Sequence, residues 1–261
     1  HHFTRKSSVI RLKWSQLGLD RKIIISIISI GLSPFSMMVA SSAVNVIMNT
    51  SLMHYGGDLA VGAFGIINTI LGLLLVTVLG LNQGTQPIIG YNYGAGDFKR
   101  VRHTLYYTLK IATIITASGW IIGELFPKQI VMAFTTDEEL LRITEKGVRI
   151  AVAALPLVGM QIVASSFFQS LGYAFKSIIQ SLSRQLIFLV PGIILFPRLW
   201  ELNGLWIAIP VSDTLAAMLS LTLLIGQIRI LKKMEQLNNN SSKKNISEVT
   251  IEQSTVNEYL Q

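Results

Sequence analysis

Long apolar blocks, separated by short polar or glycine-rich breaks, run through most of the chain. Each block holds about twenty or more residues, which is enough for one helix to cross roughly 30 Å of hydrocarbon. The blocks predict membrane-spanning helices at about residues 23–53, 59–86, 99–126, 148–173, 183–199 and 204–230. We therefore predict an all-α polytopic membrane protein with six transmembrane helices.

Both ends of the chain are polar. Residues 1–22 are basic and are expected to form either a short amphipathic helix on the membrane surface or a solvated connecting segment. Residues 233–261 are rich in Asn, Ser, Lys and Glu, so they cannot bury a core and are expected to be disordered. The chain begins with His1 and His2 instead of an initiator methionine, so we expect it to start inside a longer reading frame.

The charge distribution fits a membrane protein and predicts its orientation. Only 14% of the residues are charged, whereas about a quarter are charged in a typical soluble protein. The net charge is +8, but Lys and Arg cluster at the ends of the apolar blocks, which argues against a nucleic-acid partner. Sixteen of them lie on one side of the six predicted helices and five on the other. Because cationic residues favour cytoplasmic loops, we predict a multi-pass protein of the plasma (inner) membrane with both ends in the cytoplasm.

The stretch from Leu79 to Asp97 differs from the other helix ends, because it combines several amides with five glycines and a proline. Unsatisfied amides are costly in hydrocarbon, so this stretch should pack against protein or line a polar path. We predict that its first part is the inner end of the second helix and that residues 91–96 form the turn that follows.

Two further polar features lie inside predicted helices. Asn45 and Asn49 are four residues apart and project from one face, where they either line a cavity or bond to a neighbouring helix. Asp213 lies inside the last helix, where a carboxylate is costly and is by default a candidate functional group. It is our candidate for binding a proton or a cation, with a structural hydrogen bond as the alternative. Arg184 is expected to lie too close to the cytoplasmic side to reach it.

Enzyme chemistry finds little support in the sequence. It shows no carboxylate pair, serine–histidine pairing or metal-ligand spacing, and it contains no cysteine for thiol chemistry. The glycines at 94–96 lack the Lys-Ser/Thr that follows in a phosphate-binding loop. We predict that the protein is not an enzyme and has no catalytic residue, metal or cofactor.

A set of motifs in a fixed order carries a resemblance to a known family. The run ahead of the basic cluster reads Gly84-x-Gln86-Pro87-Ile88-Ile89-Gly90-Tyr91-Asn92-Tyr93-Gly94-Ala95. The other motifs are Gly31-Leu32-Ser33-Pro34-Phe35, Ser181-Leu182-Ser183-Arg184-Gln185 ahead of Pro191, and Gly204-Leu205-Trp206-x-Ala208-x-Pro210-x-Ser212-Asp213. Together, over residues 23–232, they resemble the second half of multidrug and toxin extrusion (MATE) transporters.

This resemblance implies a twelve-helix antiporter built from two six-helix lobes around a central cavity. Cationic or amphipathic drugs would leave the cell in exchange for protons or sodium ions, and this chain would be the C-terminal lobe. Its partners would be the lipid bilayer, a missing N-terminal six-helix lobe and a small cationic substrate. The candidate residues that line the cavity are Phe35, Asn45, Asn49, Gln83, Gln86, Gln161 and Gln169.

One departure from the family bears on the coupling ion. Sodium-coupled members carry acidic residues where this chain has Ser41 and Ser42 in the first helix and Met160 and Gln161 in the fourth. We therefore expect proton coupling through a carboxylate of the other lobe. A lipid-linked oligosaccharide flippase of the same superfamily is an alternative that would require a more basic cavity, and only Arg184 comes close. A membrane-embedded enzyme is the less favoured alternative.

Overall fold

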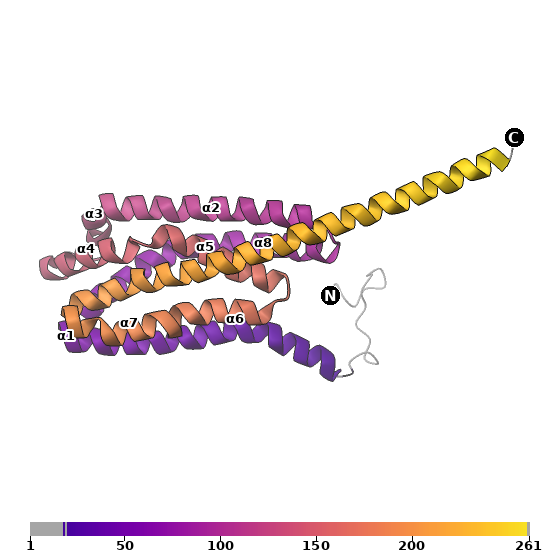
Figure 1. Ribbon diagram of the computed structural model, residues 1–261. Coiled ribbons are helices and arrows are strands. Elements are labelled where there is room, and N and C mark those ends of the chain that lie inside the picture. Colours follow the sequence, from indigo (N-terminus) through magenta and orange to yellow (C-terminus); the bar gives the residue numbers. More distant parts are fainter. Residues whose placement is uncertain (1–17, 19, 260–261) are drawn as a thin grey trace, which may run out of the picture.

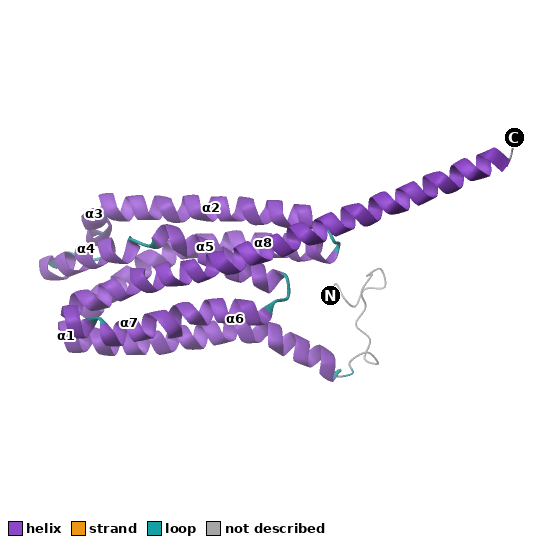
Figure 2. Ribbon diagram, in the orientation of Figure 1, coloured by secondary structure: helices purple, strands orange, loops and turns teal. Residues whose placement is uncertain are grey.

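The computed structural model describes residues 18 and 20–259, with the side chains at 26, 29, 30, 33, 34 and 239–259 outside the description. Most of the predicted basic segment 1–22 thus lies outside the described residues. The described part consists of helices joined by short turns and contains no strand (Figure 2). In chain order the elements are α1 (Arg21–Gly94), α2 (Phe98–Leu125), α3 (Pro127–Met132), α4 (Glu138–Val152), α5 (Leu155–Ser170), α6 (Ala174–Leu182), a π-helix (Ser183–Leu189), α7 (Val190–Leu195) and α8 (Pro197–Tyr259).

Helix α1 consists of two antiparallel arms that meet at Gly57 (Figure 1). Gly57 has φ 66° and ψ −164°, a backbone conformation that is essentially restricted to glycine. The first arm runs away from the end of the bundle where α1 begins, and the second arm returns to it. Gly57 lies between the first two helices predicted at 23–53 and 59–86.

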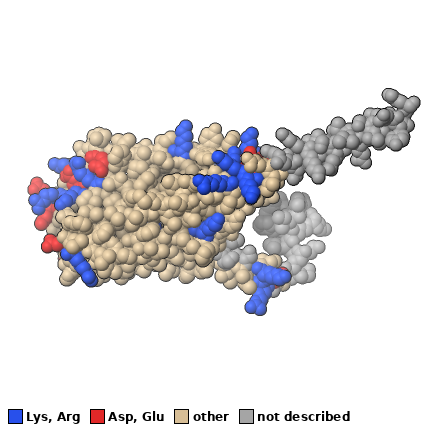
Figure 3. Space-filling model, in the orientation of Figure 1, with Lys and Arg blue, Asp and Glu red and all other residues tan. Residues whose placement is uncertain are grey.

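The described helices run the length of the bundle six times, as the sequence predicts, and each such passage is called a crossing here. The two arms of α1, α2 and α8 account for four crossings. Helices α4 and α5 form a fifth crossing that is bent by 54° at the break between them, next to Pro156. The sixth is the continuous segment Ala174–Leu195, made of α6, the π-helix and α7. Figure 3 shows that most charged side chains gather toward the two ends of the bundle, with a flank between them that carries few charges.

The fifth predicted helix begins nine residues earlier than the expected start at Ser183. The chain turns after α5, where the Tyr173 N–H donates to the Phe168 carbonyl, and α6 begins at Ala174. The hydropathy pattern misses this start because Lys176 and several polar residues interrupt the apolar run. Two of those residues, Ser177 and Gln180, are buried against protein, so the segment can be polar without contacting lipid.

Helix α8 also differs from its predicted extent of 204–230. It begins at Pro197, is kinked at Trp200 and Glu201, and continues through the tail that was expected to be disordered as far as Tyr259. No glycine or proline occurs after Gly226, so the sequence contains no local signal that ends the helix. Glu235 anchors the first part of this extension through a 2.9 Å ion pair with Arg102 of α2.

The core consists of two apolar clusters. One contains Trp206 of α8 packed with residues from both arms of α1 and from α4. The other contains Phe167 and Phe168 of α5, packed against α2 and the second arm of α1. Helices α2 and α5 approach closely at Gly159, where an added Cβ would lie 2.8 Å from the Thr116 hydroxyl oxygen and 2.9 Å from the Ala112 carbonyl oxygen. These clusters leave a polar region between the π-helix, α1 and α8.

Candidate functional site

A cavity of about 400 Å³ lies between the two arms of α1, the π-helix and α8. Its size falls in the range of small-molecule sites, which are about 300–1,000 Å³. The wall is mostly apolar and holds a few polar groups. Its lining residues are Ser41, Val44, Asn45, Met48, Phe64, Ile67, Asn68, Leu71, Gly72, Leu75, Arg184, Gln185, Leu189 and Ile209.

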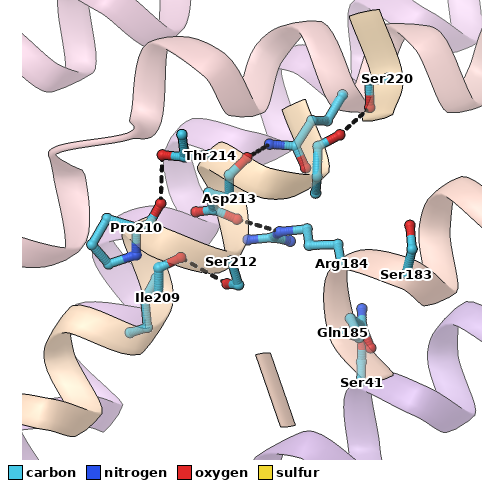
Figure 4. A network of polar contacts seen from close by, with 12 residues as sticks. Ser41, Ser183, Arg184, Gln185, Ile209, Pro210, Ser212, Asp213, Thr214 and Ser220 are labelled. Carbon is cyan, nitrogen blue, oxygen red and sulfur yellow. Dashed lines mark hydrogen bonds and ion pairs between the residues drawn. The ribbon is translucent and has the colours of Figure 1, made fainter. Parts of the chain in front are cut away.

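Arg184 and Asp213 form an ion pair at this wall, with Arg184 Nε 2.5 Å from Asp213 Oδ1 (Figure 4). The Asp213 side chain is only 3% exposed, whereas that of Arg184 is 30% exposed and reaches the cavity. The expectation that Arg184 could not reach Asp213 is wrong. Because α6 begins at Ala174, Arg184 lies ten residues into the segment, about 15 Å along the helix axis at 1.5 Å per residue.

The π-helix directs two consecutive side chains, Arg184 and Gln185, toward the interior of the protein. The N–H of Val190 donates to the Gln185 carbonyl five residues earlier, as in a π-helix. Pro191 follows and has no N–H to donate to the carbonyl of Ile187, which disfavours ordinary α-helical bonding here. The wider turn lets Arg184 reach α8 while the Gln185 amide nitrogen donates to the Ser41 hydroxyl oxygen at 2.7 Å.

A network of buried amides fixes the backbone around Asp213. Gln161 of α5 donates from Nε2 to the Asp213 carbonyl oxygen at 2.8 Å. Gln180 of α6 donates to the Gln161 carbonyl oxygen and to the Ser220 hydroxyl oxygen, both at 3.0 Å. These hydrogen bonds link α5, α6 and α8 on the buried side of the ion pair. Gln161, predicted as a cavity residue, is buried in this network and does not line the cavity.

The other predicted site residues are distributed over several places. Asn45 lines the cavity, and Asn49 lines a separate open depression near Met53 and His54. Gln86 Nε2 donates to Gln169 Oε1 at 3.1 Å, so these two amides pair with each other between α1 and α5.

Two predicted site residues, Phe35 and Gln83, are exposed on the first and second arms of α1. Neither lines the cavity. The sequence reasoning did not name Ser41, Asn68 or Gln185 as lining residues. Asn68 carries a usable signal, since it is an isolated amide in the middle of an apolar block.

The MatE family model matches residues 34–194, which is more than half of the chain. The chain belongs to the MatE family. Multidrug export protein MepA of Staphylococcus saprophyticus is 22% identical over 205 residues, which cover 78% of this chain and 44% of that protein. MepA of Staphylococcus aureus is likewise 22% identical, over 83% of this chain and 48% of that protein.

Solved MATE structures share the fold. The MATE multidrug transporter DinF-BH is 35% identical with a TM-score of 0.74, over 84% of this chain and 49% of that one. A MATE in the bent conformation has a TM-score of 0.82 at 24% identity, over 90% of this chain and 52% of that one. This MATE chain thus spans about half the length of the relatives it matches, and the family consists of membrane transporters.

Proposed function

We propose that the chain is the C-terminal six-helix lobe of a secondary antiporter. It exports cationic or amphipathic drugs in exchange for protons or sodium ions, and a second six-helix lobe alternates with it between inward-open and outward-open states. The observation that carries this proposal is a cavity of about 400 Å³ inside a bundle of membrane-spanning helices, with a mostly apolar wall that holds a few polar groups. Polar groups at membrane depth are tolerated where they face protein or a cavity, and they mark transport paths.

The coupling carboxylate is assigned to the second lobe. Asp213 remains this lobe's candidate for a proton or a cation, but its carboxylate is already paired with Arg184. A proton or a cation would have to compete with the Arg184 guanidinium for the Asp213 carboxylate. The described residues also hold no group of three or more His, Asp or Glu that could bind a metal ion.

A flippase for lipid-linked oligosaccharides is the second candidate, because Arg184 does reach the cavity. Such a substrate carries several phosphate charges and calls for a strongly basic wall. Arg184 is the one Lys or Arg among the residues that line this cavity, and Asp213 neutralises it. The mostly apolar wall favours the drug exporter.

The proposal can be tested by measuring dye efflux. Pump-deficient cells express the reading frame that contains this chain, and the export of a fluorescent cationic dye is followed. Asn45→Leu removes one amide from the cavity wall, and we expect the efflux rate to fall about fivefold, the equivalent of one hydrogen bond of about 1 kcal/mol. Thr222→Leu is the matched control, because Thr222 is exposed on α8 and bonds only to the Leu219 carbonyl. Equal efflux by both variants would contradict the cavity assignment.

A further inference from the structure

A stripe of basic and aromatic side chains runs along the outward face of α2. Its members follow one another at intervals of four, three and four residues, which places them on one side of a helix. All of them are exposed, and they are Lys99, His103, Tyr106 and Lys110. Farther along α2 the same side presents Ile114 and Ile121, which are also exposed. The stripe therefore begins with basic groups and continues as an apolar surface.

Lys110 lies at membrane depth. A helix of 28 residues is about 42 Å long, whereas the hydrocarbon core is about 30 Å thick. Lys110 comes about 18 Å after the start of α2 at Phe98, so a centred α2 places its backbone about 12 Å inside the hydrocarbon. An ammonium is costly there, and such groups usually face protein or pair with another polar group. Lys110 is exposed and forms no ion pair or hydrogen bond with any described residue, so we expect a partner outside this part of the chain.

The described carboxylates at the start of α2 and on the adjoining part of α8 are already engaged. Glu235 forms its 2.9 Å ion pair with Arg102, and Asp97 caps the first turn of α2. On α8, Lys232 and Lys233 are exposed as well. This end of the bundle therefore presents more exposed ammonium groups than free carboxylates. Such an excess attracts anionic lipid headgroups.

Helix geometry directs Lys110 toward the headgroups at this end. Side chains on a helix tilt toward its N-terminus, so the Lys110 stem points back along α2 toward Tyr106 and Tyr107. These tyrosines are 48% and 66% exposed, and exposed tyrosines are typical of the membrane–water interface. A four-carbon stem spans only part of the distance to the surface, and local thinning of the bilayer brings headgroups inward to meet it.

We propose that Lys110 binds the phosphate of an anionic phospholipid, in the leaflet at the end of the bundle where α2 begins. The hydroxyl groups of Tyr106 and Tyr107 donate to the same phosphate, and an acyl chain lies along Ile114 and Ile121. A zwitterionic lipid would bring its own cation next to the exposed basic groups, so the stripe selects net-negative headgroups. This surface lies outside the cavity and does not depend on the proposed transport.

The test measures lipid binding to the protein expressed from the whole reading frame that contains this chain. The protein is purified in dodecyl maltoside and titrated with dioleoyl phosphatidylglycerol or dioleoyl phosphatidylcholine, and native mass spectrometry gives the affinity for each. We expect the unaltered protein to prefer phosphatidylglycerol. Lys110→Gln should lower the affinity for phosphatidylglycerol about fivefold and leave that for phosphatidylcholine nearly unchanged, because one cationic residue at a lipid surface contributes about 1 kcal/mol.

Two further variants separate the stripe from the overall charge. Lys110→Arg keeps the cation and should keep the preference for phosphatidylglycerol. Lys146→Gln is the matched control, because Lys146 is exposed on α4 near the other end of the bundle, and its loss lowers the net charge equally. Since Lys110 has no bond to a described residue, its replacement should not disturb folding. An equal loss in Lys110→Gln and Lys146→Gln would assign the preference to net charge and overturn the site.

A competition arm distinguishes a lipid from a soluble anion as the source of the phosphate. Inorganic phosphate is added to the protein saturated with phosphatidylglycerol. Lipid that stays bound supports the lipid assignment, whereas displacement by inorganic phosphate would overturn it. An unchanged preference in Lys110→Gln would also overturn the proposal, and this result is expected if the second lobe covers the stripe.

Discussion

At the scale of single residues, the Arg184–Asp213 pair is asymmetric in its exposure to the cavity. Asp213 is 3% exposed and depends on Arg184, whereas Arg184 is 30% exposed and retains access to the cavity. Removing one partner of a buried pair leaves an uncompensated charge, and its cost increases with the burial of the group that remains. The two single neutralisations should therefore have unequal effects on stability.

We predict that Arg184→Gln lowers the free energy of unfolding by about 3–5 kcal/mol and that Asp213→Asn lowers it by only about 1–2 kcal/mol. The double variant should recover most of the loss, because no unpaired charge remains. Thermal unfolding of the four proteins in detergent, treated as a double-mutant cycle, measures this. Equal effects of the single variants that add in the double variant would contradict the burial argument.

The sequence identifies some of these residues and misses others for physical reasons. Asp213 is evident because any carboxylate inside an apolar block is costly. Its partner could not be predicted, because the reach of Arg184 depends on a helix start that hydropathy places nine residues too late. The pairing of Gln86 with Gln169 likewise depends on which faces of α1 and α5 meet. Single-chain periodicity places a residue on a face but does not say what lies opposite.

At the scale of elements, polar side chains that face protein make a helix look shorter in the sequence than it is. For this reason the hydropathy pattern does not show that α6 begins at Ala174. The π-helix has no sequence signal apart from Pro191, which follows it. The start of α2 at Phe98, capped by Asp97, which accepts from the Arg100 N–H, falls within one residue of the predicted start at 99. The end of α1 does not match its prediction, because the helix continues to Gly94, eight residues past the expected end at 86, and includes residues 91–94 of the expected turn.

Close contact between α2 and α5 gives a prediction at this scale. Gly159→Ala places a methyl group 2.8 Å from the Thr116 hydroxyl oxygen and 2.9 Å from the Ala112 carbonyl oxygen, so the helices must separate. We expect a loss of about 1–3 kcal/mol in the free energy of unfolding. Gly65→Ala is the control, because its added Cβ meets nothing within 4 Å and should stabilise the helix by about 0.5–1 kcal/mol. The denaturation midpoint should fall in Gly159→Ala and rise in Gly65→Ala. An unchanged midpoint in Gly159→Ala would argue against this close packing of α2 and α5.

At the scale of the whole molecule, an even number of crossings puts both ends of the chain on the same side of the membrane. In Figure 1 the start of α1, the turn between α1 and α2 and the extended end of α8 all lie at the same end of the bundle. The turn from α3 to α4 lies at the other. From the excess of Lys and Arg at the first end we predict that this end faces the cytoplasm.

Because the sequence contains no cysteine, single cysteines can report this orientation without background labelling. Lys99 and Thr136 are both exposed, at the α1–α2 end and the α3–α4 end of the bundle respectively. We predict that a membrane-impermeant maleimide labels Thr136→Cys in intact cells and labels Lys99→Cys only after permeabilisation. The unaltered chain should stay unlabelled in both conditions. The reverse labelling pattern would place both ends of the chain outside the cytoplasm. The end of the bundle next to Gly94 would then face outward, and its Lys and Arg residues would be an exception to the preference of cationic residues for the cytoplasmic side.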